Sequence, residues 1–252
     1  MADQAVQPIR PAATVILIQD VEDAGQFEIF MLRRTSRAAF AGGMYVFPGG
    51  RVDGDDHLHS NDRWRTGPTE RQATQQTALG AEWRGYWIAG IRETFEEAGL
   101  LLAYHDNGEM VGFDESSSDR FEHYRHDVHA GKITLAEICA TEKLSLAVDH
   151  IHFFNRWITP LGRPRRFDTR FFIAEAPPAQ RGQHDDKETV DSVWITPQRA
   201  LERHAADDFG LMGVTLRQLQ TLAEHRTVAD VREMLETQED FPIFRPVLPA
   251  GA

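Results

Sequence analysis

Apolar and polar residues follow two different periods along this chain, which predicts a mixture of strands and helices. Short apolar runs, several rich in β-branched or aromatic residues, are typical of buried strands. These runs cover residues 12–19, 27–33, 101–104, 150–160, 165–175 and 188–197. Helices are predicted where the pattern changes, over residues 90–100 and 121–142.

Helix-start signals predict three more helices toward the C-terminus. Pro197 is suited to the first turn of a helix, and Thr215 and Thr227 are expected to be the N-caps of two amphipathic helices. The earlier residues 57–84 are polar, with a predicted turn at Gly67-Pro68 and a weak helix after it. Aromatic residues at the end of this stretch are expected to pack the following helix on a sheet.

Composition excludes several classes of protein. The chain has 252 residues, with 41% hydrophobic and 26% charged residues, as is ordinary for a globular protein. Its net charge of −12 argues against nucleic acid or an anionic membrane as a partner. No apolar run approaches the roughly 18 residues of a membrane helix, and the N-terminus lacks the pattern of a signal peptide. The single cysteine, Cys139, fits a reducing compartment, so we expect a cytoplasmic protein with a buried thiol.

Most of the candidate metal-binding and catalytic residues lie in the stretch G-I-R-E-T-F-E-E-A-G-L, which begins at Gly90. On a helix, Glu93, Glu96 and Glu97 share one face, where like charges repel and lower stability. One interpretation is a solvated acidic face. The other is that a hard divalent cation, Mg²⁺ or Mn²⁺, lies between the carboxylates, with Arg92 placed to steady one of them.

The same stretch resembles the second half of the Nudix box, G-x5-E-x7-R-E-U-x-E-E-x-G-U, where U is aliphatic. The matching residues are Arg92, Glu93, Glu96, Glu97, Gly99 and Leu100. F-P-G-G-R-V-D-G-D-D, from Phe47, resembles the first half, and Asp56 stands where the box has its first Glu. Thr94 departs from the aliphatic position. Thirty-five residues rather than seven separate Asp56 from Arg92, which leaves the role of Asp56 open.

A box split in this way resembles one branch of the family, the coenzyme A diphosphatases. The run R-R-T-S-R-A-A-F-A-G-G-M-Y-V-F-P-G-G partly resembles the additional motif of that branch through Arg34, Gly43 and the F-P-G-G residues. It departs at Thr35 and at Ala39, where the motif has a second Arg that Arg37 would have to replace. The later pattern W-I-T-P…R-F-D-T-R-F-F resembles the same branch.

The resemblance implies a fold and a domain organisation. The expected fold is an α/β protein, the Nudix α/β/α sandwich around a mixed sheet, with a helical insertion and C-terminal helices. A single domain would span residues 1–252. Within it we expect an insertion in the Nudix box at 57–84, a helical insertion at 105–145 and closing helices at 215–239.

The resemblance also implies a reaction. The expected activity is metal-dependent hydrolysis of a diphosphate linkage in a small nucleotide-derived substrate. Coenzyme A or acyl-coenzyme A is preferred, giving 3′,5′-ADP and (acyl-)phosphopantetheine. The predicted ligands of Mg²⁺ or Mn²⁺ are Glu93, Glu96 and Glu97. Arg92 and Glu188 complete the predicted catalytic set, with Asp186 as a second candidate acid.

The predicted substrate contacts are basic residues and glycines. Arginine offers paired donors to phosphate, and glycine lets backbone approach a ligand closely. The candidates are Arg34, Arg37, Gly49, Gly50, Arg166 and Arg170. The alternative for the arginines is an ordinary solvated surface, and for Glu188 a surface carboxylate.

Three alternative functions stay open. The first is a Nudix pyrophosphatase that acts on ADP-ribose, NADH or a dinucleotide. The second is a module that binds a nucleotide as a sensor, without turnover. The third is isopentenyl diphosphate isomerase chemistry, which needs a catalytic cysteine and is disfavoured by the apolar neighbours of Cys139. Dimers are common among Nudix proteins, so a homodimer is one expectation. Two sets of histidines, His57 with His59 and the series His123, His126 and His129, are expected to be solvated.

Overall fold

The computed structural model describes residues 7–21, 25–38, 41–60, 62–80, 83–185 and 187–247. Two residues discussed above, Ala39 and Asp186, lie outside these ranges, as does the side chain of His59.

In the described ranges a mixed, eight-stranded sheet forms the centre of the fold. Its order is β10 (Thr189–Ile195), β2 (Gln26–Arg34), β1 (Ile9–Val21), β9 (Arg166–Glu175), β8 (Ile151–Ile158) and β11 (Ile243–Phe244). Two short strands, β3 (Tyr45–Val46) and β4 (Gly49–Arg51), pair with β2 and β1. β1 runs parallel to β9 and antiparallel to β2 and β4. The strands predicted in this sheet are confirmed.

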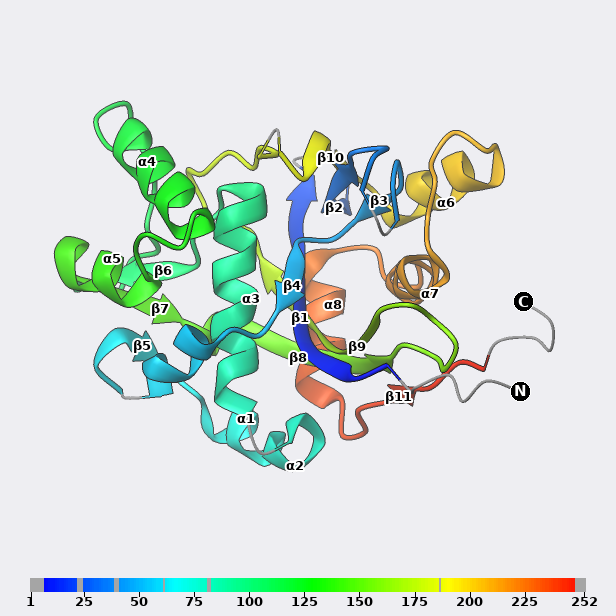
Figure 1. Cartoon of the computed structure of the whole chain (residues 1–252), viewed down its shortest axis with the longest axis horizontal. Helices are drawn as coiled ribbons and strands as arrows, with labels where there is room; N and C mark the ends of the chain where they lie inside the picture. The colour runs from blue at the N-terminus through cyan, green and yellow to red at the C-terminus, as the bar shows by residue number, and fades with distance from the viewer. Residues whose placement is uncertain are drawn as a thin grey trace.

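Strand β1 is buried on both faces, because helices cover the sheet from both sides. Successive side chains of a strand point to opposite faces. Val15 therefore joins the cluster of α3 (Trp83–Ala98), whereas Ile16 joins that of α7 (Gly213–Leu222) and α8 (Val228–Thr237). Figure 1 shows α3 on one side of the sheet and α7 and α8 on the other. The predicted sandwich around a mixed sheet is confirmed.

Helix α3 packs closely on the sheet. A Cβ at Gly90 would lie 2.9 Å from Val15 Cγ2, so a side chain there would push the helix away. Trp87 packs against Phe172 and donates its indole N–H to the Ile151 carbonyl at 3.1 Å, which confirms the predicted aromatic packing. The helix ends before Gly99, whose φ of +69° favours glycine.

A smaller sheet lies beside α3 (Figure 1). Its strand order is β5 (Arg65–Thr66), β7 (Leu144–Ala147) and β6 (Ala103–His105). The predicted strand at 101–104 is confirmed as β6, whereas β5 was not predicted. Three 3₁₀ turns, η1 (Gly54–Ser60), η2 (Asp62–Trp64) and η3 (Val148–His150), flank this region. The weak helix predicted after Gly67-Pro68 is confirmed as α1 (Glu70–Thr74), capped by Thr69, and α2 (Gln76–Leu79) follows it.

The single helix predicted over residues 121–142 is wrong. The chain forms α4 (Ser118–His129) and α5 (Leu135–Glu142) instead. Gly131 between them has a φ of +65°, and Thr134 caps α5 with a capping box that includes Glu137. These local signals end the first helix and start the second.

The closing helices agree with two of the three predicted starts. Pro197 opens α6 (Pro197–Ala205), and Thr227 caps α8. The prediction for Thr215 is wrong, because α7 begins at Gly213 after Met212 and Thr215 is buried within it. No helix in the described part of the chain is long and apolar enough to cross a membrane.

Candidate functional site

A cleft of about 670 Å³ brings together most of the predicted site residues. β1, β4 and β9 form its floor, the start of α7 forms one wall, and the acidic face of α3 forms one end. The predicted residues that line it are Arg34, Gly49, Gly50, Arg92, Glu93, Glu96, Glu97 and Glu188.

The two glycines of β4 let Glu93 and Glu97 approach the backbone. Gly49 N–H donates to Glu97 Oε2 at 2.9 Å. A Cβ at Gly50 would lie 2.4 Å from Glu93 Oε1, and a Cβ at Gly49 would lie 2.5 Å from Thr14 Oγ1. Any other residue at either position would therefore displace the strand or the carboxylate.

The surroundings of Glu93 and Glu97 disfavour the charged form of each carboxylate and raise both pKa values. Burial raises the pKa of Glu93 to about 7, although the Arg92 charge acts in the opposite direction. Burial and repulsion from Glu93 raise the pKa of Glu97 well above its ordinary range, and the Gly49 N–H opposes this. Arg34 lowers and Glu188 raises the same pKa, so both of these residues act on Glu97. A cation between Glu93 and Glu97 would relieve their repulsion.

Arg92 ties the helix to the residue before the insertion. Its Nη1 donates to Glu93 Oε1 and to Glu96 Oε1, both at 2.9 Å. Its Nε and Nη2 donate to the two oxygens of Asp56, at 3.0 and 3.1 Å. Asp56 is almost fully buried and also accepts from Asp53 N–H at 2.7 Å. Although thirty-five residues separate them in sequence, Asp56 and Arg92 meet in the fold, which gives Asp56 the role of orienting Arg92.

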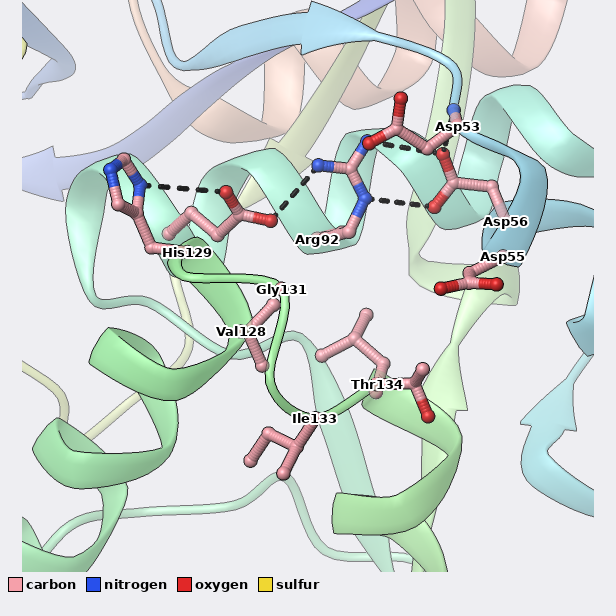
Figure 2. Close-up of a pocket in the computed structure, with 11 residues that line it drawn as sticks. Asp53, Asp55, Asp56, Arg92, Val128, His129, Gly131, Ile133 and Thr134 are labelled. Carbon is pink, nitrogen blue, oxygen red and sulfur yellow. Dashed lines mark hydrogen bonds and ion pairs between the residues drawn. The ribbon is translucent and has the colours of Figure 1, made fainter.

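Figure 2 shows a smaller pocket of about 160 Å³ behind this network, between the acidic turn η1 and the link from α4 to α5. In this network Arg92 pairs with Asp56 at 3.0 Å and with Glu96 at 2.9 Å. His129 Nδ1 lies 3.6 Å from the second Glu96 oxygen, so a nitrogen lies near each oxygen of this carboxylate.

His129 is a site residue that the sequence analysis missed. It was expected to be solvated, like His123 and His126, but it lines the cleft. Its neighbour in the series, His126, is exposed and pairs with Glu122. His57 is half-buried against α3, where a Cβ at Gly85 would lie 2.7 Å from its ring, so its predicted exposure is wrong. A spacing of three residues could not show which histidine faces the site, because the helix ends at His129 itself.

Arg125 of α4 holds the end of α3 in place and was also missed. Its buried guanidinium donates to the carbonyl oxygens of Glu96 at 2.9 Å, Glu97 at 3.0 Å and Gln183 at 2.9 Å. The last carbonyls of a helix have no partner within the helix, and a cation there is favourable. Arg125 therefore fixes the backbone that carries Glu96 and Glu97.

Glu188 and Arg34 pair with each other in the lining of the cleft. Arg34 Nη2 donates to Glu188 Oε2 at 3.2 Å, and the Glu188 side chain is 49% exposed. Glu188 is accessible to water and held by one partner, as a proton acceptor would need to be. Arg37 is exposed and does not line the cleft.

Arg166 and Arg170, which the sequence predicted to contact substrate, do not line the cleft. Both are buried and point to the α3 side of β9. Arg166 donates to the carbonyls of Thr159 and Gln7. Arg170 donates to the Leu79 carbonyl, pairs with Asp168 at 2.9 Å, and lies 4.0 Å from the centre of the Tyr86 ring. These contacts stabilise the fold and leave neither guanidinium at the cleft.

The other end of the cleft is lined by the face of β9 that lies opposite to Arg166 and Arg170. Alternation along β9 turns Phe167, Thr169 and Phe171 into the cleft. Arg10 of β1 and Arg165, just before β9, join them. Successive residues along β9 face opposite sides of the sheet, so Arg165 and Arg166 are expected to point in opposite directions. Which of the two faces the cleft depends on the register of β9 with β1.

The donor chemistry of the acidic end fits a hard divalent cation. All the candidate donors are oxygens, and two of the three carboxylates are buried against the same strand. Among the residues that the structure describes, no three acidic, histidine or cysteine side chains already form a closed metal site. Glu96 does not complete such a site with Glu93 and Glu97, because its carboxylate is bound by Arg92 and lies near His129. Glu93 and Glu97 are thus the better placed pair.

Comparison with known proteins identifies the family. Residues 66–220, well over half of the chain, match the NUDT19 Nudix domain. The chain belongs to this Nudix family. Nudix hydrolases generally use a divalent metal ion, which agrees with the donor chemistry of the acidic end.

The chain is also similar to curated proteins. The chain is 24% identical over 246 residues to acyl-coenzyme A diphosphatase NUDT19 of Xenopus laevis, covering 84% of this chain and 64% of the relative. It is 27% identical over 244 residues to the Gallus gallus protein of the same name, covering 82% and 64%. The chain thus spans slightly less than two thirds of the length of these relatives.

A solved structure supports the fold of this Nudix protein. The crystal structure of a NUDIX hydrolase from Alicyclobacillus acidocaldarius aligns with a TM-score of 0.74, at 21% identity, over 94% of this chain and 99% of that one. At this identity the likeness shows the fold, and the chemistry depends on the cleft itself.

Proposed function

We propose that this Nudix protein hydrolyses the diphosphate linkage of coenzyme A or acyl-coenzyme A, giving 3′,5′-ADP and (acyl-)phosphopantetheine. The observation that carries the proposal is the burial of Glu93 and Glu97 against the Gly49–Gly50 backbone, at one end of a cleft whose other end bears arginines. The names of the curated relatives, acyl-coenzyme A diphosphatases, support the substrate.

The proposed metal is Mg²⁺ or Mn²⁺, held by Glu93 and Glu97, with Glu96 as a third ligand after it exchanges its present partners. A bound divalent ion supplies neutralisation of the diphosphate oxygens and activation of water. Arg92 bridges Glu93 and Glu96 and orients both carboxylates. Asp56 in turn fixes Arg92 and keeps its charge near the carboxylates.

The chain would also supply proton transfer and phosphate contacts. Glu188 would accept a proton from the attacking water, since its carboxylate is accessible and lies close enough to influence Glu97. Arg34 holds Glu188 and has further donors for a phosphate oxygen. In the reaction the water oxygen joins one phosphorus, and the bridging oxygen leaves with the other.

Product identification by mass spectrometry tests the proposal. The chain would be incubated with Mg²⁺ or Mn²⁺ and an equal mixture of coenzyme A, acetyl-coenzyme A, ADP-ribose, NADH and diadenosine polyphosphates. We expect 3′,5′-ADP with phosphopantetheine or its acetyl form. AMP released from ADP-ribose or NADH instead would overturn the substrate and keep the reaction class. Binding of a nucleotide without any product would indicate the sensing module.

The location and assembly of the chain stay predictions. The buried, unpaired thiol of Cys139 agrees with a reducing compartment such as the cytoplasm. A homodimer remains to be tested, and sedimentation of the purified chain would measure it directly.

A further inference from the structure

The arginines that line the cleft fall into two groups. Arg34 and Arg92 are each paired with acidic residues. Arg10, Arg51 and Arg165 are exposed and line the same cleft, yet none makes an ion pair within the described ranges. The same cleft is also lined by five acidic residues, Asp53, Glu93, Glu96, Glu97 and Glu188. Positive charge left unpaired inside a cleft is available to an anionic ligand.

Strand register places Arg10 beside Phe167, and Arg165 lies two residues before Phe167 along the chain. β1 and β9 are parallel, with Ile9 opposite Arg166 and Arg10 opposite Phe167. Neighbouring strands are about 5 Å apart. Arg10 shares the cleft face with Ala12 and Thr14, and Arg165 shares it with Phe167. Two arginines and one aromatic residue therefore line the same corner of the cleft.

This corner lies one nucleoside away from the acidic end. Gly50, which touches Glu93, is opposite Ala13, three residues along β1 from Arg10. Three residues of a strand span about 10 Å. A ribose phosphate is separated from the 5′-diphosphate of the same nucleotide by a single sugar, a comparable span once the arginine side chains extend. Arg51, opposite Ala12, lies between the two positions and suits the diphosphate itself.

We propose that Arg10 and Arg165 bind the ribose 3′-phosphate of an adenosine 3′-phosphate 5′-diphosphate substrate. The proposal rests on the proposed function, because it names the part of coenzyme A that this corner recognises. Two arginines provide paired donors for the three oxygens of a phosphate monoester. Substrates with an unmodified ribose, such as ADP-ribose and NADH, lack the group that this corner would hold.

The test measures binding without turnover. Isothermal titration of the metal-free chain would compare adenosine 3′,5′-bisphosphate with 5′-AMP, which differ only in the ribose phosphate. We expect the bisphosphate to bind at least about tenfold more tightly to the wild type. Arg10→Ala and Arg165→Ala should each remove most of that preference. Arg163→Ala is the matched control, because Arg163 is exposed two residues away and does not line the cleft.

A kinetic measurement separates this proposal from the proposed function. The ratio of kcat/KM for coenzyme A to that for dephospho-coenzyme A should fall toward one in Arg10→Ala and Arg165→Ala, through KM. Equal binding of bisphosphate and AMP by the wild type overturns the ribose-phosphate site, whatever the protein cleaves. A preserved preference in both variants overturns the assignment to these arginines. Preferential binding without cleavage of coenzyme A contradicts the proposed function and supports the site.

Discussion

The two ends of the cleft are built in opposite ways. At the acidic end Glu93, Glu96 and Glu97 each have a defined hydrogen-bond partner, and Arg92 links two of them to Asp56. At the other end Arg10 and Arg165 are exposed and make no ion pair with any described residue. The first end is organised before a ligand arrives, and the second is free to adjust to one.

This difference fits the demands of the proposed reaction. Groups that act on the reacting atoms must be held in one geometry, since a displacement of about 1 Å can cost about a hundredfold in rate. Groups that recognise a distant part of the substrate need to be near it, and long, solvated side chains can reach. Substitutions at the acidic end should therefore change kcat, whereas substitutions at the arginine end should change KM and specificity.

The largest expected effect is at Glu97. Glu97→Gln removes one charge that would hold the metal, so kcat should fall about 10³-fold, the equivalent of several kcal/mol of lost charge stabilisation. Steady-state kinetics with coenzyme A measure this. The amide oxygen of Gln can still accept from Gly49 N–H, so the fold should be kept.

A second readout shows whether the loss involves the metal. Added Mg²⁺ should raise the melting temperature of the wild type, because a ligand bound to the folded state stabilises it, and this shift should shrink in Glu97→Gln. Glu233→Gln, an exposed change on α8, is the control. Full activity in Glu97→Gln would remove the acidic end from the mechanism.

Arg125 tests whether the acidic end depends on support from α4. Arg125→Ala leaves the carbonyls of Glu96, Glu97 and Gln183 without their charged donor, which should cost about 3 kcal/mol of unfolding free energy. The end of α3 should shift, so kcat should fall about tenfold at temperatures where the variant is folded. Urea unfolding and kinetics measure the two effects.

The control for this change lies on the same helix. Arg120 is 48% exposed and pairs with Glu142, so Arg120→Ala should cost less than about 1 kcal/mol and leave kcat unaffected. If Arg125→Ala lost stability but kept full kcat, α3 would hold its own geometry and the support from α4 would be purely structural.

The acidic end could be found from the sequence because its chemistry is local. Glu93, Glu96 and Glu97 lie within five residues, and helical spacing alone places them together. The strands were predictable for a similar reason, since their apolar runs are long and continuous. What spacing could not supply is Asp56, because thirty-five residues separate it from Arg92 in the sequence.

The arginine end could not be found in this way, because it depends on strand register. In R-P-R-R-F-D-T-R the basic residues look equivalent. A shift of one residue along a strand reverses the face of every side chain, so Arg165 reaches the cleft whereas Arg166 and Arg170 are buried on the other side. The break between α4 and α5, which aims His129 at Glu96, depends likewise on the glycine between the two helices.

The comparison of Arg170 with Arg165 sharpens this distinction. Arg170→Ala removes an ion pair to Asp168 and two hydrogen bonds to Leu79, so it should cost about 3 kcal/mol of unfolding free energy and change the KM for coenzyme A less than twofold. Arg165→Ala should instead change the unfolding free energy by no more than about 0.5 kcal/mol and raise the KM for coenzyme A about tenfold. Urea unfolding and initial rates on both variants give the comparison, and matching phenotypes would contradict the register argument.

Cys139 should show the smallest effect, and it tests the isomerase alternative. Burial raises the pKa of its thiol to about 12, so the thiol stays protonated and unreactive through the physiological range. In the folded protein at pH 8 a thiol reagent such as Ellman's reagent should react only slowly, and after unfolding one thiol per chain should react at once. Cys139→Ala should keep kcat within about twofold while costing about 1 kcal/mol of stability. Rapid labelling of the folded protein, or a large loss of turnover in Cys139→Ala at full stability, would bring a reactive cysteine back into the mechanism. Such a result would also favour isomerase chemistry over the carboxylate-based hydrolysis that the acidic end supports.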